Sequence, residues 1–309
     1  MTYLEAAEFL KSHDNYLLLT HKRPDGDTIG CAAGLCRGLR ALGKTAHICP
    51  GTGATPIFLP YLLPSLDATK VFQDYLQGRQ APPDFAPGTV VSVDVASLGL
   101  LPANAAPYQG RIDLAIDHHP SNEFFAQETC LEADKAACGE IIWKIADHLG
   151  IMNSAIATPL YVAVATDTGC FVYGNTTPHT HRVAAALMEQ DIPYQALNKR
   201  HFRTKSLRRM KLESLILQNI KLYQEGTVAV APISLAMMAQ ANATDDDAED
   251  IAAFLGQIEG VLHSATIREL RPGECKISLR TNPNYLNATA TCARLGGGGH
   301  GAASGCTVC

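Results

Sequence analysis

Near the start of the chain stands the sequence Tyr16-Leu17-Leu18-Leu19-Thr20-His21-Lys22-Arg23-Pro24-Asp25-Gly26-Asp27-Thr28-Ile29-Gly30. Its first part is apolar, which is typical of a buried parallel strand, and small and apolar residues then recur at helical spacing over 28–42. The polar residues between these two segments therefore form a strand-to-helix turn. Such turns lie at the carboxyl ends of strands, where α/β sheets bind their ligands.

This turn contains three side chains that hard metal ions accept as ligands, namely His21, Asp25 and Asp27. Pro24 and Gly26 bend the backbone so that alternate carboxylates can point at one place. Two carboxylates this close repel each other unless a proton or a cation lies between them. An isolated Asp-Gly-Asp is more often a plain turn with a helix N-cap. The metal hypothesis therefore depends on further acidic residues elsewhere in the chain.

The composition narrows the class of protein. The 309 residues, of which 47% are hydrophobic, are enough for one large core or two ordinary ones. A net charge of -5 excludes a globally basic nucleic-acid-binding surface, although not local basic patches. No apolar run reaches the length of a membrane span, and the first residues lack the features of a signal peptide. We therefore expect a cytoplasmic protein without a membrane partner.

The ten cysteines are scattered through apolar segments, so reduced and mostly buried thiols are expected. Cys306 and Cys309 form the one closely spaced pair, which alone is weak evidence for zinc binding or redox chemistry.

Strand-like segments alternate with helical ones in the first half of the chain. The strand candidates are residues 16–20, 46–49, 69–72, 89–94 and 113–117. This alternation predicts an α/β fold with a doubly wound, mainly parallel, five-stranded sheet. Two of the later strands end in acids: one at Asp94, the other at Asp117, followed by His118 and His119. Because parallel strands end at the same edge of a sheet, we expect these residues to lie beside the first turn.

One further acid, Asp167, closes the apolar segment 159–168. It is either an acid that happens to end a helix or another ligand of the same site. Residues 175–178 are a favourable helix start.

A basic stretch without an acid runs from Lys199 to Lys211. A solvated connecting helix and a phosphate-facing surface explain it about equally well. We expect a first domain at 1–195, a basic helical linker at 196–224 and a second domain at 225–309. The last segment has a strand at 227–233, acids at 245–247 that open a helix, and a hairpin of 261–270 with 274–280. It predicts a smaller α+β domain.

The chain ends in Leu295-Gly296-Gly297-Gly298-Gly299-His300-Gly301-Ala302-Ala303-Ser304-Gly305 and four further residues. Successive glycines permit positive φ angles and leave backbone N–H groups accessible, which is typical of an anion-binding nest. A flexible linker is the alternative, but a strand-prone tail follows, which favours the phosphate or nucleotide cradle.

Taken together, these motifs resemble those of the DHH/DHHA1 phosphoesterase family, and within it the bacterial nanoRNase (oligoribonuclease) and pAp-phosphatase group. The matching residues, in chain order, are His21-Lys22-Arg23-Pro24-Asp25-Gly26-Asp27, Asp94, Asp117-His118-His119, Asp167, Ser278-Leu279-Arg280, Gly296-Gly297-Gly298-Gly299 and His300. They span nearly the whole chain in the order of the family, and their combination is specific.

The resemblance implies a DHH metal-binding catalytic domain and a DHHA1 substrate-binding domain across a cleft. It implies two divalent cations per chain, usually Mn²⁺, with Mg²⁺ or Co²⁺ as candidate substitutes. Their ligands would be His21, Asp25, Asp27, Asp94, His118 and Asp167. Asp94 and Asp167 would be shared between the cations, with Asp94 the stronger candidate for a bridging ligand. Asp117 would orient His118.

By the same resemblance, the catalytic residues would be Asp94 and His119, with His119 facing the substrate phosphate. The substrate-binding residues would be Arg280, Gly297, Gly298, Gly299 and His300.

The function that this resemblance implies is two-metal-dependent hydrolysis of short oligonucleotides (nanoRNA and dinucleotides) and of pAp, by an exonuclease of the 3′-5′ oligoribonuclease type. The alternatives are a signalling phosphodiesterase for cyclic or linear dinucleotides (c-di-AMP or pApA), an inorganic pyrophosphatase or polyphosphatase, and a nucleotide-binding regulator with an inactive metal site. The expected partners are short RNA or DNA oligonucleotides or nucleotides as substrates. A preference for RNA or DNA, and a homodimer, are left open.

Overall fold

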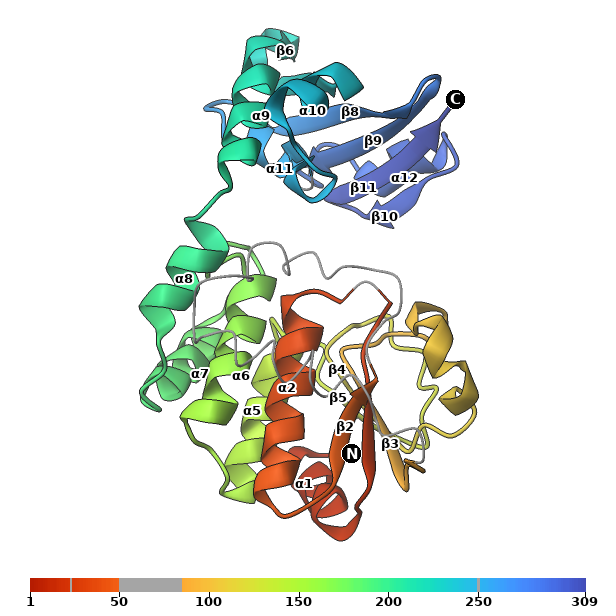
Figure 1. Cartoon of the computed structure of the whole chain (residues 1–309), viewed down its shortest axis with the longest axis vertical. Helices are drawn as coiled ribbons and strands as arrows, with labels where there is room; N and C mark the ends of the chain where they lie inside the picture. Colours follow the sequence, from red (N-terminus) through yellow and green to blue (C-terminus); the bar gives the residue numbers. More distant parts are fainter. Residues whose placement is uncertain (23, 50–84, 249–250) are drawn as a thin grey trace. The chain divides into compact units, whose positions relative to one another are not determined.

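The computed structural model describes residues 1–22, 24–49, 85–248 and 251–309 (Figure 1). They form two compact units, Met1–Thr204 and Lys205–Cys309. The division falls within the basic stretch that we expected to be a linker. The predicted strand at 69–72 and residue Arg23 of the first motif lie outside the described residues.

The first unit contains a five-stranded sheet in the order β2-β1-β3-β4-β5, with every neighbouring pair parallel. Its strands are β1 (Tyr16–Leu19), β2 (Ala46–Cys49), β3 (Thr89–Val93), β4 (Leu114–Asp117) and β5 (Glu128–Leu131). The predicted parallel α/β sheet is confirmed. Strand β5 was not predicted, because this edge strand has an exposed Glu128 and no apolar run.

Helices cover one face of this sheet (Figure 1). They include α1 (Tyr3–Ser12), α2 (Gly26–Ala41), α5 (Cys138–Leu149), α6 (Ser154–Asp167), α7 (Pro178–Met188) and α8 (Tyr194–Phe202). Tyr16 and Leu18 of β1 point into this helical core, whereas Leu17 and Leu19 point to the other face, as the alternation along a strand requires. Among the described residues, the second face packs against the short 3₁₀ segments η2 (Leu98–Leu100) and η3 (Ala103–Tyr108).

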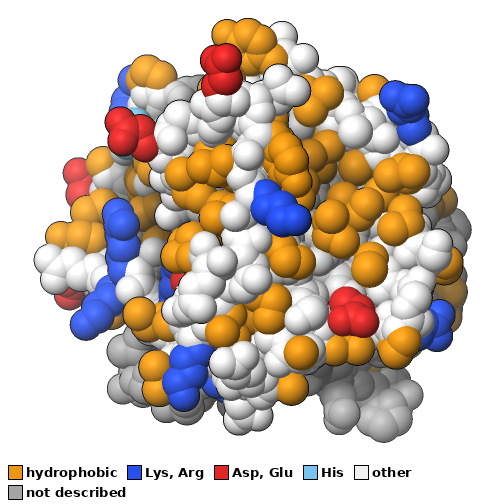
Figure 2. All heavy atoms as spheres, turned by 90° about the horizontal axis from the view of Figure 1, so that it is seen from above, with side chains coloured by type: hydrophobic (Ala, Val, Ile, Leu, Met, Phe, Trp, Pro, Cys, Tyr) orange, Lys and Arg blue, Asp and Glu red, His pale blue; other side chains and the backbone are white. Residues whose placement is uncertain are grey.

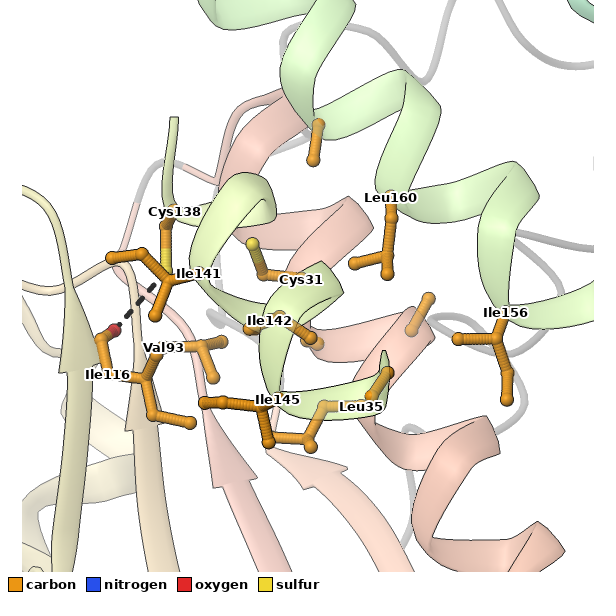
Figure 3. Close-up of a cluster of buried hydrophobic side chains, with 14 of the residues drawn as sticks. Cys31, Leu35, Val93, Ile116, Cys138, Ile141, Ile142, Ile145, Ile156 and Leu160 are labelled. Carbon is orange, nitrogen blue, oxygen red and sulfur yellow. Dashed lines mark hydrogen bonds between the residues drawn. The ribbon is translucent and has the colours of Figure 1, made fainter. Parts of the chain in front are cut away.

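The helical core is continuous from the sheet to α6 (Figure 3). Val93 and Ile116 of the sheet, Cys31 of α2 and Leu160 of α6 belong to the same buried cluster. The Cys138 thiol at the start of α5 donates a hydrogen bond to the carbonyl of Ile116, at 3.3 Å. The start of α5 is thereby tied to the end of β4.

Helices α2 and α6 pack closely against each other because α2 carries a glycine at every fourth position. These glycines are Gly26, Gly30, Gly34 and Gly38. A Cβ atom at Gly30 would lie 2.3 Å from the carbonyl oxygen of Pro159, and one at Gly26 would lie 2.2 Å from Oγ1 of Thr166. The contacts run antiparallel, so the first turn of α2 lies against the last turn of α6.

The second unit contains a six-stranded sheet in the order β10-β11-β9-β8-β7-β6. Its strands are β6 (Lys221–Tyr223), β7 (Val228–Ile233), β8 (His263–Arg271), β9 (Glu274–Thr281), β10 (Gly298–His300) and β11 (Ala303–Val308). Only β7 and β8 pair in parallel within it, among the described strands. The predicted strand at 227–233 and the predicted hairpin around Arg271-Pro272-Gly273 are both confirmed.

The helices of the second unit are α9 (Leu207–Gln218), α10 (Leu235–Ala241), α11 (Ile251–Leu255) and α12 (Ala288–Ala293), with the short 3₁₀ segments η4 (Gln224–Gly226) and η5 (Asp246–Ala248). Leu212 and Ile216 of α9 pack with residues of β7, α10 and α11 in one core. A smaller cluster, Leu279, Ala288, Cys292 and Cys306, fills the other side under α12.

The glycine-rich stretch is part of this sheet. Residues Gly298–His300 form β10 and pair with β11. A Cβ at Gly297 would lie 2.2 Å from the carbonyl of Gly305, and one at Gly299, whose φ is +143°, would lie 2.6 Å from the carbonyl of Ala303. These two glycines are therefore required by close backbone packing, and the stretch is not a plain linker.

Several large apolar side chains of the second unit remain exposed, among them Leu207, Met210 and Leu217 of α9. Figure 2 shows hydrophobic side chains spread over one face of the molecule, with charged side chains scattered among them. In the described parts of the chain, no helix combines the length and the apolar character that crossing a bilayer requires.

Candidate metal centre

The acidic and histidine side chains that follow β1, β3 and β4 meet at the carboxyl edge of the first sheet. Nε2 of His21 lies 3.6 Å from Oδ1 of Asp25 and 3.8 Å from Oδ2 of Asp94. Nε2 of His118 lies 3.5 Å from Oδ1 of Asp94. Residues more than 90 positions apart in sequence are thereby brought to one place by the parallel sheet.

Asp167 joins this cluster from the last residue of α6. Nε2 of His118 lies 3.7 Å from Oδ2 of Asp167 and 3.7 Å from Oδ2 of Asp27. The glycine-dependent packing of α2 on α6 is what places these two acids near each other. All six residues that were expected as metal ligands are thus in one cluster. Together with His119, they form three groups: His21, Asp25 and Asp94; Asp94, His118 and His119; and Asp27, His118 and Asp167.

Asp94 and His118 each belong to two of these groups, and Asp94 is the one carboxylate that two groups share. Its side chain is buried, and its backbone has a φ of +58°, in the left-handed region. The carboxylate Oδ1 atom is fully enclosed and has no hydrogen-bond partner among the described residues. A buried carboxylate oxygen without a partner costs free energy, which a cation bound to it would offset.

Asp27 is held by the start of α5. Its two carboxylate oxygens accept hydrogen bonds from the backbone N–H groups of Cys138, at 2.7 Å, and Gly139, at 3.0 Å. The thiol of Cys31 donates a third, at 3.2 Å. The free N–H groups and the dipole at a helix N-terminus stabilise a carboxylate. Asp27 is therefore fixed while its Oδ2 still faces His118.

The two histidines that follow β4 are oriented by different groups. Nδ1 of His118 lies 3.1 Å from the carbonyl oxygen of Lys135. Because a carbonyl can only accept, Nδ1 carries the hydrogen, and Nε2 is left with a lone pair that could bind a metal ion. Nδ1 of His119 instead donates to Oδ1 of Asp117, at 2.8 Å.

The resemblance implied that Asp117 orients the ring of His118. In the structure, it does not. Its Oδ1 accepts the backbone N–H of His118, and its Oδ2 accepts from the side chain of Asn122. The side chain of Asp117 is turned toward His119, so the orienting role for His118 passes to a backbone carbonyl. No sequence pattern reveals such a partner.

The electrostatics of the cluster are those of crowded acids. Burial, reinforced by the charges of Asp27 and Asp25, raises the pKa of Asp94 well above its usual range and that of Asp167 to about 8. Burial also raises the pKa of Asp27. For His119, the hydrogen bond to Asp117 raises the pKa. Without a cation, ionising these acids costs stability, so the cluster is suited to positive charge at its centre.

The chemistry of the donors fits a divalent cation. Carboxylate oxygens with imidazole nitrogens suit Mn²⁺ and similar ions, and the three groups contain no thiolate. The Cys31 thiol near Asp27 is buried, which raises its pKa well above the usual value.

The substrate-binding candidates lie in the second unit. Arg280 and Gly298 line a cavity of about 240 Å³. Gly297 and Gly299 flank Gly298 and are fixed by backbone packing, and the backbone of His300 pairs with Ala303. Sequence reasoning missed Arg268 and Lys276, which line the same cavity. Their alternation with Ser278 and Arg280 on the predicted hairpin was the available signal.

Comparisons with known proteins place these observations in a family. Residues 15–164 match the model of the DHH family, N-terminal domain. A curated relative from Thermus thermophilus, named bifunctional oligoribonuclease and PAP phosphatase NrnA, is 32% identical over 98% of this chain and 87% of its own. A protein of the same name from Bacillus subtilis is 24% identical over 98% of this chain and 92% of its own.

Among solved structures, an exopolyphosphatase-related protein from Bacteroides fragilis is similar in fold. It is 24% identical, covers 98% of this chain and 90% of its own, and superposes with a TM-score of 0.81. This likeness covers both the parallel sheet of the first unit and the sheet of the second.

Proposed function

This chain belongs to the DHH family, and we propose that it is a metal-dependent phosphoesterase that hydrolyses short oligonucleotides and pAp. The observation that carries the proposal is the cluster of four aspartates with His21 and His118 at the sheet edge, around the unpartnered Oδ1 atom of Asp94. The names of relatives aligned over 98% of the chain support the substrate class.

The proposed cofactor is a pair of Mn²⁺ ions. His21, Asp25 and Asp94 would hold one, and Asp27, His118 and Asp167 the other. Asp94 would bridge them, because its two carboxylate oxygens face different histidines. When bound, such ions supply charge neutralisation and Lewis-acid polarisation for phosphoester hydrolysis.

His119 is proposed to act on the substrate rather than to bind metal. Its Nδ1 is occupied by the hydrogen bond to Asp117, and its ring is about one-third exposed. The opposite ring nitrogen, Nε2, is then the atom left for a non-bridging phosphate oxygen. Asp117, itself held by Asn122, would keep the ring in this orientation.

The cavity of the second unit is proposed to hold a phosphate or nucleoside part of the substrate. Arg268, Lys276 and Arg280 contribute positive charge, and Ser278 contributes a hydroxyl group. Ile233 and Ile251 line the same cavity and offer an apolar surface. A mixed cavity of this kind suits a nucleotide better than an inorganic anion alone.

A hydrolysis panel with Mn²⁺ tests the proposal. The substrates are pAp, pApA, a five-nucleotide RNA, a five-nucleotide DNA, c-di-AMP and pyrophosphate. We expect turnover of pApA and pAp, and loss of turnover when EDTA removes the metal. Hydrolysis of pyrophosphate alone, or of c-di-AMP alone, would contradict the proposed substrate class.

A further inference from the structure

A single peptide group lies between His118 and a buried carboxyl group that the proposed reaction does not use. The carbonyl of Lys135 accepts the hydrogen bond from Nδ1 of His118, at 3.1 Å. The N–H at the other end of that same peptide, on Ala136, donates to Oε1 of Glu140, at 3.3 Å. Glu140, the Lys135-Ala136 peptide and His118 thus form a continuous hydrogen-bonded chain that ends at the metal-ligand atom Nε2.

Glu140 stands in the first turn of α5 and is only 1% exposed. Its Oε1 also accepts a hydrogen bond from the hydroxyl of Thr180 in α7, at 2.8 Å. Its Oε2 is buried without a hydrogen-bond partner among the described residues, 3.6 Å from Nε2 of His179. Burying a carboxyl group in this way costs free energy, which packing alone does not offset.

We propose that Glu140 is a positioning residue that orients His118 through the Lys135-Ala136 peptide. Because a peptide group is planar, holding its N–H end fixes the direction of its carbonyl. The carbonyl in turn fixes the ring of His118 with hydrogen on Nδ1, as the partners of metal-binding histidines do. Successive hydrogen bonds in a buried chain also polarise one another.

This inference rests on the proposed metal site, so the test measures metal affinity rather than turnover. Mn²⁺ binding is titrated for the parent chain, Glu140→Ala, His118→Ala and the double variant. Loss of a partner that orients a metal ligand weakens affinity about tenfold or more, and Glu140→Ala should show such a loss. In the His118→Ala background, Glu140→Ala should cause no further loss, because its effect passes through the missing ring.

Equal losses in both backgrounds, or no loss in either, would overturn the inference. Failure of the proposed metal site looks different, because the parent chain would then bind no Mn²⁺ at all. Failure of the proposed substrate class would appear only in the hydrolysis panel.

Two conservative variants keep the test decisive if Glu140→Ala does not fold. Glu140→Gln retains an oxygen that can accept from Ala136 and should bind Mn²⁺ nearly as the parent does. Glu140→Asp is one methylene shorter, cannot reach that N–H without displacement, and should bind more weakly. Equal affinity for both would contradict the inference. Glu213→Ala, which removes a buried carboxyl group in the second unit, is the matched control and should leave Mn²⁺ affinity unchanged.

Discussion

At the scale of single residues, Asp94 combines features that a purely structural residue would not retain. It occupies the left-handed backbone region, where Asp and Asn are the most readily tolerated side chains after glycine. It is buried among other acids, and one of its oxygens has no hydrogen-bond partner among the described residues. Residues with a strained backbone or an unfavourable environment are concentrated at active sites and ligand-binding sites.

Asp94→Asn should therefore stabilise the metal-free protein. The amide keeps the shape and tolerates the left-handed backbone, but removes the cost of an acid beside Asp27 and Asp167. If this relief is worth about 1 kcal/mol, the Tm of the first unit rises by about 2–4 °C in EDTA. Thermal unfolding with EDTA and with Mn²⁺ checks this.

In Mn²⁺ the order should reverse, because the parent gains more binding free energy than the variant. Asp147→Asn, an exposed acid on α5, is the control and should change neither value. A lower Tm of Asp94→Asn in EDTA would show that the Asp94 carboxyl group does not destabilise the metal-free protein.

The two neighbouring histidines should separate metal binding from reaction rate. His118→Ala removes a ligand atom that faces Asp27, Asp94 and Asp167, and should lower the amount of bound Mn²⁺. His119→Ala removes a ring whose Nδ1 is already bound to Asp117, and should keep the metal while lowering kcat. Elemental analysis of both purified variants decides this. Equal metal loss in the two would mean that His119 is a ligand as well.

The sequence indicated these candidate ligands because the acids and histidines follow apolar strands or, for Asp167, close an apolar helix. It could not reveal what orients them. The hydrogen-bond partner of the His118 ring is the backbone carbonyl of Lys135. Every residue has a backbone carbonyl, so the sequence does not show which one binds the ring. Glu140 stands in an otherwise helical pattern, where an acid in the first turn is usually explained by the helix dipole.

At the scale of elements, the site depends on how closely α2 packs against α6. The two helices bring Asp27, in the first turn of α2, and Asp167, the last residue of α6, to the same histidine. The glycine at every fourth position of α2 makes this possible, since a Cβ at Gly30 would meet the backbone of Pro159. Backbone cannot move aside as a flexible side chain can.

Gly30→Ala should therefore displace α6, lower the stability by about 1–3 kcal/mol, and weaken Mn²⁺ binding. Gly110→Ala is the matched control, because a Cβ there meets no atom within 4 Å and should be neutral. Denaturant unfolding and Mn²⁺ titration of both variants check this. Parent-like metal affinity in a destabilised Gly30→Ala would show that the two acids do not depend on this packing.

The sequence predicted β1 to β4 because their apolar runs are separated by turns and helical segments. It did not predict β5, an edge strand in which only Cys130 is buried and Glu128 is exposed. The glycine spacing in α2 was visible as small residues at helical intervals. Its partner helix could not be identified, because the sequence of one helix does not show which other helix packs against it.

At the scale of the whole molecule, the first unit is proposed to carry the chemistry and the second to bind the part of the substrate that is not cleaved. Arg280→Ala should then lower kcat/KM for pApA by roughly ten- to a hundredfold, the cost of about 1.5–3 kcal/mol for one charged phosphate contact. Hydrolysis of bis-p-nitrophenyl phosphate, which has no nucleoside to hold, should be nearly unchanged.

Arg271→Ala is the control for this comparison, since Arg271 is the exposed last residue of β8, beside the hairpin turn, and does not line the cavity. It should leave both activities unaltered. If Arg280→Ala reduces the hydrolysis of both substrates equally, Arg280 acts in the chemical step and not through substrate binding.

The basic stretch at the division between the units contributes less free charge than its sequence suggests. Lys205 and Arg209 pair with Glu213, and Arg208 pairs with Asp247. These acids lie beyond the stretch in sequence, so the local pattern showed only the positive charges. Attraction of phosphates by this segment is correspondingly reduced.

In the proposed phosphoesterase, the clustered aspartates and histidines would bind two divalent cations through a shared Asp94. The most direct test counts Mn²⁺ per chain at equilibrium and measures pApA hydrolysis in the same samples, for the parent and Asp94→Asn. We expect two ions and turnover in the parent, with fewer ions and no turnover in the folded variant. Two ions and sustained hydrolysis in Asp94→Asn would contradict this proposal.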